Sequence, residues 1–163
     1  MISVPIKYIP KNLTKKHRKQ QKKMLLKSRR LYKQKKYYTR KKVSSYKSKP
    51  SKHVLKARRI YKIKNVVPNK ILAKKTGCTL KGLKKIVNKG EGAYYSSGSR
   101  PNQTARSWGL ARLASSITGG KSAAVDFHII KESCKPTKKA YSLAKKALKK
   151  HGHGTRKVPK VKI

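Results

Sequence analysis

Residues 90–120 read "GEGAYYSSGSRPNQTARSWGLARLASSITGG", and their composition differs from that of the chain on either side. Lysine and arginine almost disappear in this stretch, while glycine, serine, a tyrosine pair and the single tryptophan are concentrated in it. The only phenylalanine follows at position 127. Because aromatic side chains bury much apolar area and small residues allow close packing, we expect residues 90–130 to form the core. The flanking residues should then bind outward.

Turn-forming residues divide this stretch into a series of expected elements. The chain should be extended at residues 94–95 and turn at residues 101–102, because proline and asparagine favour turns. A helix should follow over residues 104–118, starting near Asn102 or Thr104, and end at the glycine pair after it. The run "SAAVDFHII" at 122–130 then indicates a buried strand with one apolar face.

The net charge of the chain indicates the kind of partner that it binds. The 163 residues include 48 lysines and arginines against three acidic residues, giving a formal charge of +45. A solvated face normally mixes both signs of charge, yet residues 1–90 contain 32 basic residues and no acidic one. Such a chain repels itself unless nucleic acid, an anionic membrane surface or an acidic protein supplies counter-charge. The basic residues expected to contact this polyanion are Lys15, Lys16, Arg18, Lys22, Lys23, Arg29, Arg30, Arg40, Lys41, Lys42, Arg58, Arg59, Lys81, Lys84 and Lys85.

Composition also divides the chain into three regions. Residues 1–67 are expected to form a basic N-terminal arm, residues 68–130 the folded core module, and residues 131–163 a basic C-terminal helix and tail. The predicted fold class is α+β: a small, mainly helical module with a short buried strand, flanked by long extended or helical basic arms.

Helices are expected in both flanking regions. The first should begin near Asn12 or Thr14, since either residue can cap a helix. Residues 54–63 are compatible with a short helix or a strand. A basic amphipathic helix is expected at about residues 138–150, followed by an extended basic segment.

A helical hairpin is expected where the core module begins. Asn69 should cap a helix over residues 70–76 that ends at Gly77, and Thr79 should cap a second helix over residues 79–88. The spacing is similar to that of a helix-turn-helix, so the second helix could read DNA. Its exposed residues are lysines, however, which contact phosphate rather than specific bases, and this favours a packing hairpin.

The tyrosines of the N-terminal region allow two interpretations. Tyr37, Tyr38 and Tyr46 lie among lysines and serines. Tyrosines in such surroundings can stack on bases. They can equally anchor the chain in a protein groove, and the sequence alone leaves both interpretations open.

The candidates for catalysis, metal binding and membrane insertion are few. The strongest catalytic candidate combines Asp126 and His128 with Arg100, Arg106 and either Tyr94 or Tyr95, although the pairing of Asp126 with an arginine inside the core is the favoured interpretation. Cys78 and Cys134 are expected to be reduced thiols, since they are too far apart in sequence for a metal-binding knuckle. "HGHG" at 151–154 is expected to be a tail turn rather than a metal site. We expect no cofactor, metal or small-molecule substrate. The chain should be soluble or peripheral, since no apolar run reaches the ~20 residues that cross a bilayer and the first residues do not form a signal peptide.

The central stretch resembles a known family. Together with "KIVNKG" before it and the lysine-rich residues upstream, "GEGAYYSSGSRPNQTARSWGLARLASSITGGKSAAVDFHI" is similar to a domain family of unassigned activity encoded by nucleocytoplasmic large DNA viruses, including chlorella-type and mimivirus-type giant viruses. The similarity covers about residues 7–131 and is most specific over residues 92–104. The residues that carry the motif are Tyr94, Tyr95, Arg100, Pro101, Asn102, Gln103, Thr104 and Trp108.

The resemblance implies a viral setting and no established catalytic residues. We therefore expect a non-enzymatic structural virion protein, a minor capsid protein on the inner face of the capsid. Its basic regions would bind major and minor capsid proteins, and also the viral DNA or the inner membrane surface. The alternatives are a DNA-condensing protein of the virion core, a ribosomal-type RNA-binding protein and, last, a DNA-modifying enzyme.

Overall fold

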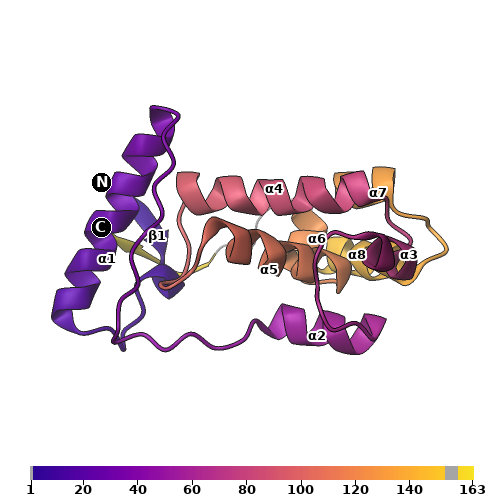
Figure 1. Ribbon diagram of the computed structural model, residues 1–163, viewed down its shortest axis with the longest axis horizontal. Coiled ribbons are helices and arrows are strands. Elements are labelled where there is room, and N and C mark those ends of the chain that lie inside the picture. Colours follow the sequence, from indigo (N-terminus) through magenta and orange to yellow (C-terminus); the bar gives the residue numbers. More distant parts are fainter. Residues whose placement is uncertain (1, 153–157) are drawn as a thin grey trace. The chain divides into compact units, whose positions relative to one another are not determined.

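The computed structural model describes residues 2–152 and 158–163, and these residues are predominantly helical (Figure 1). The expectation of a mainly helical protein with a short strand is confirmed at this level, although the strands are β1 and β2 rather than residues 122–130. The elements are β1 (Ser3–Pro5), a 3-10 turn η1 (Ile6–Tyr8), α1 (Lys15–Lys33), α2 (Lys52–Tyr61), α3 (Lys70–Thr76), α4 (Leu80–Ser96), α5 (Ala105–Ile117), α6 (Lys121–Val125), α7 (Phe127–Ser133), α8 (Lys139–His151) and β2 (Lys160–Lys162).

The described residues form two compact units, each with its own apolar core. Unit 1 comprises residues 2–49, 91–108 and 158–163, and unit 2 comprises residues 50–90 and 109–152. This division differs from the arm, core module and tail that composition suggests. The beginning of the chain, the middle of the motif stretch and β2 belong together in unit 1.

Unit 1 is built on α1 and the segment that returns along it. Thr14 caps α1 by accepting a hydrogen bond from the backbone of His17. After the helix, residues 36–46 run back alongside α1 (Figure 1). The core of unit 1 includes Leu25 of α1, which is completely buried, and Val43 of the returning segment. The sequence therefore predicts the start of α1 correctly. The expected basic arm, however, contributes apolar residues to a core of its own in unit 1.

The two strands of unit 1 come from distant parts of the chain. β1 and β2 pair antiparallel, with Val4 opposite Val161. Val4 is completely buried, and Val161 packs against the same core. The extended basic segment expected after α8 is thus paired with the first strand.

A buried arginine occupies the interior of unit 1. The Arg40 side chain donates hydrogen bonds to Ser28 Oγ at 2.8 Å, the Tyr94 carbonyl at 2.9 Å and Ser99 Oγ at 2.8 Å. Its guanidinium carbon lies 3.8 Å from the centre of the Tyr94 ring. Burial lowers the pKa of Arg40 below its ordinary value, and the surrounding tyrosines oppose this shift in part. The motif segment from Tyr94 to Ser99 therefore closes around a basic residue of the N-terminal region.

The turn after this segment is attached to the same returning chain. The side-chain oxygen of Asn102 accepts a hydrogen bond from the backbone N–H of Val43 at 2.7 Å. Its amide nitrogen donates to the carbonyls of Val43 at 3.2 Å and Tyr46 at 2.8 Å. Asn102 has a φ of 64°, which asparagine tolerates better than most residues. The predicted turn at residues 101–102 is confirmed, and its asparagine joins two segments of unit 1.

Unit 2 contains the helical hairpin expected from the sequence. Asn69 caps α3 through its side chain, and Gly77 ends the helix with a φ of 75°. α4 then packs Leu83 and Ile86 into the core of unit 2. The second helix is longer than predicted, because it continues through residues 94–95, which were expected to be extended.

A close contact with Gly109 accounts for the glycine at position 90 inside α4. A Cβ placed on Gly90 would lie only 2.6 Å from the Cα of Gly109. Gly90 is therefore required for the close approach of α4 to α5 and does not end a helix. Sequence patterns alone do not distinguish these two uses of glycine.

The strand expected at residues 122–130 is absent, and α6 and α7 occupy these positions. Ala123, Ala124, Ile129 and Ile130 are buried, whereas Phe127 is only partly buried. A short apolar run fits a buried strand and a buried helix equally well. The pattern of apolar residues at 122–130 therefore could not distinguish a strand from a helix.

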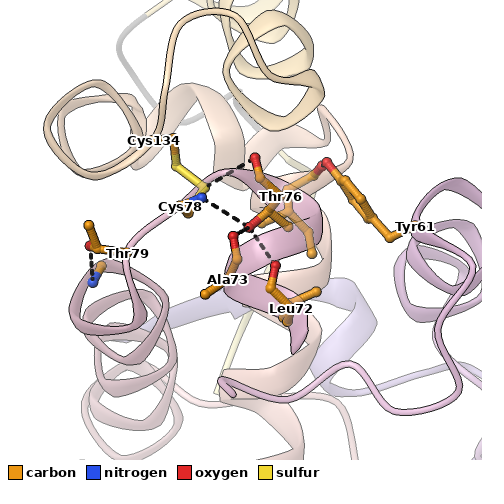
Figure 2. Close-up of a disulfide and its surroundings, with 9 residues drawn as sticks. Tyr61, Leu72, Ala73, Thr76, Cys78, Thr79 and Cys134 are labelled. Atoms are coloured by element: carbon orange, nitrogen blue, oxygen red, sulfur yellow. Dashed lines mark hydrogen bonds between the residues drawn. A yellow bond between two sulfur atoms is a disulfide. The ribbon is translucent and has the colours of Figure 1, made fainter. Parts of the chain in front are cut away.

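Cys78 and Cys134 form a disulfide in unit 2, and the expectation of two reduced thiols is wrong (Figure 2). Cys78 follows the turn between α3 and α4, and Cys134 follows α7. Backbone hydrogen bonds flank the disulfide, from Thr79 to Ser133 at 2.8 Å and from Lys135 to Gly77 at 2.9 Å. A separation of 56 residues in sequence gives no sign of this proximity in the fold.

Candidate polyanion-binding surface

Most of the basic residues expected to contact a polyanion lie at the surface of the two units. They belong to α1 and the segment that returns along it in unit 1, and to α2 and α4 in unit 2. The exposed ones are Lys15, Lys16, Lys23, Arg30, Lys41, Lys42, Arg58, Arg59, Lys81, Lys84 and Lys85, and Lys22 is half-buried.

Three of the predicted residues instead bind groups of the protein itself. Arg40 is 6% exposed and donates the three hydrogen bonds described above, so its assignment to the polyanion surface is wrong. Arg18 donates to the carbonyl of Lys11 at 2.9 Å, and Arg29 donates to the carbonyl of Ser96 at 3.2 Å. The latter two side chains are half-buried and partly committed to the fold.

The fully buried acid of unit 2 is neutralised within the fold. One carboxylate oxygen of Asp126 accepts from Lys89 at 3.0 Å and from Arg112 at 2.9 Å. The other accepts from Arg112 at 2.9 Å and from Ser116 at 3.3 Å. Burial raises the pKa of Asp126, but the hydrogen bonds and charges of Arg112 and Lys89 outweigh it, so that the net shift is downward. Asp126 therefore cancels charge inside unit 2 and leaves the exposed lysines and arginines uncompensated.

These contacts also change the interpretation of the catalytic candidate. The strand expected at residues 122–130 would place Asp126 and His128 on the same face, but α6 and α7 occupy these positions instead. Asp126 is completely buried, whereas His128 is exposed. The expected pairing of Asp126 with an arginine is confirmed, with Arg112 as the partner.

A shallow depression lies beside α1 in unit 1. It has a volume of about 460 Å³ and is open to solvent. Lys27 lies with its ammonium 4.5 Å from the centre of the Tyr38 ring, one of the residues that line the depression. Only two of its four lysines, Lys16 and Lys23, were among the residues expected to contact a polyanion. We call it the α1 depression, and its lining residues are Lys16, Lys19, Gln20, Lys23, Met24, Lys27 and Tyr38.

Three tyrosines from separate segments meet at the other end of α1. Tyr32 lies in the last turn of α1, Tyr37 follows the helix and Tyr95 belongs to α4. The rings of Tyr32 and Tyr95 are stacked, with centres 6.5 Å apart and planes at 8°. Tyr37 lies 5.1 Å from Tyr95 and 6.2 Å from Tyr32, and 70% of it is exposed. We call this cluster the tyrosine platform, and the signal for it in the sequence is the two tyrosine pairs at residues 37–38 and 94–95.

The basic helix of unit 2 is part of a packing hairpin. A Cβ on Gly82, near the start of α4, would lie 2.3 Å from the Cβ of Ser133. The disulfide fixes the turn before α4 to the end of α7. The first turn of a recognition helix must be free to enter a groove of DNA, but the first turn of α4 is covered by Ser133. This contact favours a hairpin that packs within the protein over one that reads DNA. Lys81, Lys84 and Lys85 remain as an exposed basic face.

The other residues of the family motif serve unit 1 in different ways. Trp108 packs edge-on against Tyr8, with ring centres 5.9 Å apart. Thr104 caps α5 by accepting from the backbone of Ser107 at 3.1 Å. Gln103 accepts from the Ser107 hydroxyl at 2.8 Å. Pro101 is buried and Arg100 is exposed. The motif therefore combines residues that hold the fold with an exposed cation.

Two further features of the described part of the chain concern metal binding and membrane insertion. No group of three or more histidine, cysteine or acidic side chains there could hold a metal ion. No helix there has the length and apolar character needed to cross a membrane. Half of the "HGHG" segment, residues 153–154, lies outside the described residues, so the tail turn expected there is not tested.

Comparison with known proteins gives one match. Residues 5–139 match the model of the Family of unknown function (DUF5824). No curated protein and no solved structure matches the chain. The match spans most of both units and includes every residue of the motif.

Proposed function

The chain belongs to the Family of unknown function (DUF5824), and we propose that it is a non-enzymatic structural protein of a virion, which binds acidic surfaces through its charge. The observation that carries this proposal is that nearly all of the basic residues have no acidic residue of the chain to neutralise their charge. Among the described residues, both ion pairs involve Asp126, which is buried. A formal charge of +45 on a folded framework requires counter-charge from a partner.

The folded framework supports a structural role. The basic residues of α1, α2 and α4 are held on helices with buried faces, so their positions are set before a partner arrives. A rigid set of cations loses less conformational entropy on binding than a flexible arm does. This favours a protein that fits a defined acidic surface.

The virion setting rests on the resemblance of the motif stretch to domains of large DNA viruses. In that setting the protein would be a minor capsid protein on the inner face of the shell, where it would contact acidic faces of capsid proteins, the inner membrane surface or the genome. The tyrosine platform favours a second candidate, a nucleic-acid-binding protein of the virion core, because exposed aromatic rings suit bases better than acidic side chains.

Binding of the full chain to polyanions tests the charge mechanism. We expect binding to duplex DNA and to polyglutamate, and a protein that makes 6–10 phosphate contacts should lose about 10³- to 10⁵-fold in DNA affinity between 50 and 200 mM salt. Replacing Lys81, Lys84 and Lys85 together by glutamine should reduce the slope of this dependence without unfolding unit 2. Absence of binding, or binding that does not depend on salt, would contradict the proposal.

Fractionation of purified particles tests the setting. A minor capsid protein should remain with shells after gentle release of the genome, whereas a core protein should leave with the DNA. Absence of the chain from particles of the virus that encodes it would overturn the virion proposal and leave the charge mechanism to be judged by the binding assay.

A further inference from the structure

We infer that unit 1 carries a binding site for single-stranded nucleic acid, in which bases stack on the tyrosine platform and nearby cations of α1 hold the phosphates. This inference rests on the proposed binding of acidic surfaces and names the polyanion that unit 1 prefers. Its starting point is Tyr37, which is more exposed than the other large hydrophobic side chains at the surface of the described residues. Exposure of a large ring costs free energy, so its fixed position requires an explanation.

The backbone after α1 sets the position of Tyr37. The N–H of Lys35 donates to the carbonyl of Tyr32 at 2.9 Å, and the N–H of Lys36 donates to the carbonyl of Leu31 at 2.9 Å. These two bonds are those of a Schellman motif, which usually has glycine at the position of Lys35. Lys35 adopts a φ of 58° there, in the left-handed region that disfavours lysine. The turn reverses the chain so that Tyr37 reaches the ring of Tyr32, five residues before it.

The two tyrosine pairs divide their rings between the interior and the surface. Tyr94 is completely buried against Arg40, and Tyr38 packs against the core of unit 1. Their neighbours Tyr37 and Tyr95 make the platform instead, with ring centres 5.1 Å apart. Tyr94 and Tyr38 anchor the two segments in the interior. The rings of Tyr37 and Tyr95 are therefore held in place, although neither covers the other fully. A platform of this kind is ready to accept a further ring.

The charge around the platform is strongly positive. Arg30 and Lys33 lie in the last turns of α1, and Lys35 and Lys36 follow it; all four are exposed. Glu91 is the one acidic residue in the sequence of unit 1, and it lies one helical turn before Tyr95. Four cations against one acid give a net attraction for phosphate. Lysines and an arginine among exposed aromatic rings are the composition of sites that bind single strands.

The α1 depression extends the phosphate-binding surface along the same helix. Its lysines occupy positions 16, 19, 23 and 27 of α1. At 1.5 Å per residue, they span roughly 16 Å along the helix axis, which is long enough for several phosphates of one strand. Tyr38 lines this depression and Tyr37 belongs to the platform, so consecutive residues connect the two features.

The platform favours a single strand over a duplex. In a duplex the faces of the bases are stacked on one another, so an exposed ring cannot reach them without unstacking. An unpaired base offers its face at no such cost, and stacking tolerates any base sequence. We therefore expect sequence-independent binding with a preference for single strands.

The test compares three variants of the full chain for binding to a fluorescent oligothymidylate of about 16 nucleotides. Tyr37→Ala should weaken binding about 5- to 150-fold, which corresponds to the loss of one stacked base. Tyr37→Phe should bind as the unmodified protein does, because it keeps the ring. Leu55→Ala is the matched control, since Leu55 is 49% exposed in unit 2 and its loss should leave the affinity unchanged. Circular dichroism confirms that each variant is folded.

The salt dependence separates stacking from charge. Tyr37→Ala should leave the slope of log affinity against log salt unchanged. Replacing Lys23 and Lys27 by glutamine should instead reduce the slope by about 0.7 for each phosphate that these lysines neutralise. Equal losses of affinity for Tyr37→Ala and Tyr37→Phe would overturn stacking in favour of a hydrogen bond from the hydroxyl group.

Two other outcomes distinguish this inference from the proposed function. If the protein binds duplex DNA and polyglutamate but Tyr37→Ala binds single strands normally, the inference is wrong and the proposed function stands. If the protein binds none of these polyanions, both are wrong. If Tyr37→Ala weakens binding to a capsid protein but leaves binding to single strands unchanged, the platform is a protein-docking surface and the inference is also wrong.

Discussion

Reduction of the Cys78–Cys134 disulfide should lower the free energy of unfolding of unit 2 by about 4 kcal/mol. The disulfide joins residues 56 positions apart, and therefore closes a long loop that contains α4, α5, α6 and α7. In the chain-entropy account, a cross-link stabilises a protein because it restricts the unfolded chain. Both cysteines are buried, so the thiols would stay packed after reduction and add little further cost.

The magnitude follows from the length of the loop. The entropy removed from the unfolded chain grows with the logarithm of the loop length, and a loop of 56 residues gives about 4 kcal/mol near room temperature. A domain of this size is stable by only about 5–15 kcal/mol in total. Reduction should therefore remove a large fraction of the stability of unit 2.

Urea denaturation followed by far-ultraviolet circular dichroism measures the effect. The oxidised protein should unfold at a clearly higher urea concentration than the protein in the presence of a phosphine reductant. The double variant Cys78→Ser, Cys134→Ser should behave as the reduced protein and should not respond to the reductant. Coincident unfolding curves with and without reductant, together with two titratable thiols in the native protein, would refute the reasoning.

Three further predictions concern the packing and charge of the two units. Gly90→Ala should destabilise unit 2 by about 1–3 kcal/mol in urea denaturation, because its Cβ would meet the backbone of Gly109; unchanged stability would contradict the close helix contact. Arg40→Met should destabilise unit 1 by about 2–4 kcal/mol, because three acceptors lose their donor, whereas the exposed control Lys42→Met should change the unfolding free energy by less than about 0.5 kcal/mol. The fluorescence of the single tryptophan, which packs in unit 1, follows this unfolding. The lowered pKa of Asp126 means that its stabilising contribution is present above about pH 4 and is lost as the pH falls through the folded-state pKa, so acid titration of Asp126→Asn should show a flatter curve than the unmodified protein.

Local signals in the sequence predicted several helices correctly. Thr14 and Asn69 cap α1 and α3 as expected, and Gly77 ends α3. The last helix, α8, lies within one residue of its predicted bounds. These features depend on a few neighbouring residues, so a single sequence contains the information that they require.

Features that depend on distant residues could not be predicted. The sequence shows that Arg40 is basic, but its burial depends on Ser28, Ser99 and the carbonyl of Tyr94, which the fold brings together. The disulfide and the pairing of β1 with β2 depend on long-range proximity in the same way. The tyrosine platform was not predicted, because the sequence left base stacking and anchoring both open for Tyr37 and gave no sign that Tyr32 and Tyr95 lie beside it.

The polyanion-binding residues illustrate the same limit. Most of the basic residues that were named from charge are exposed at the surface. Charge alone could not distinguish Arg40 inside unit 1 from Lys41 and Lys42 beside it. Nor could it group Lys16, Lys19, Lys23 and Lys27 into one depression, because this requires the helical geometry of α1 and the position of Tyr38.

The pairing of β1 with β2 determines the order in which the protein can fold during its synthesis. β1 leaves the ribosome before unit 2 does, yet its partner strand is made only after every described residue of unit 2. Closing so long a loop is slow compared with forming local helices. Unit 2 can therefore complete its contacts on the nascent chain before β2 has been synthesised, whereas β1 of unit 1 can pair only after β2 has been made. Unit 1 is therefore completed after unit 2, although β1 and α1 are synthesised before unit 2.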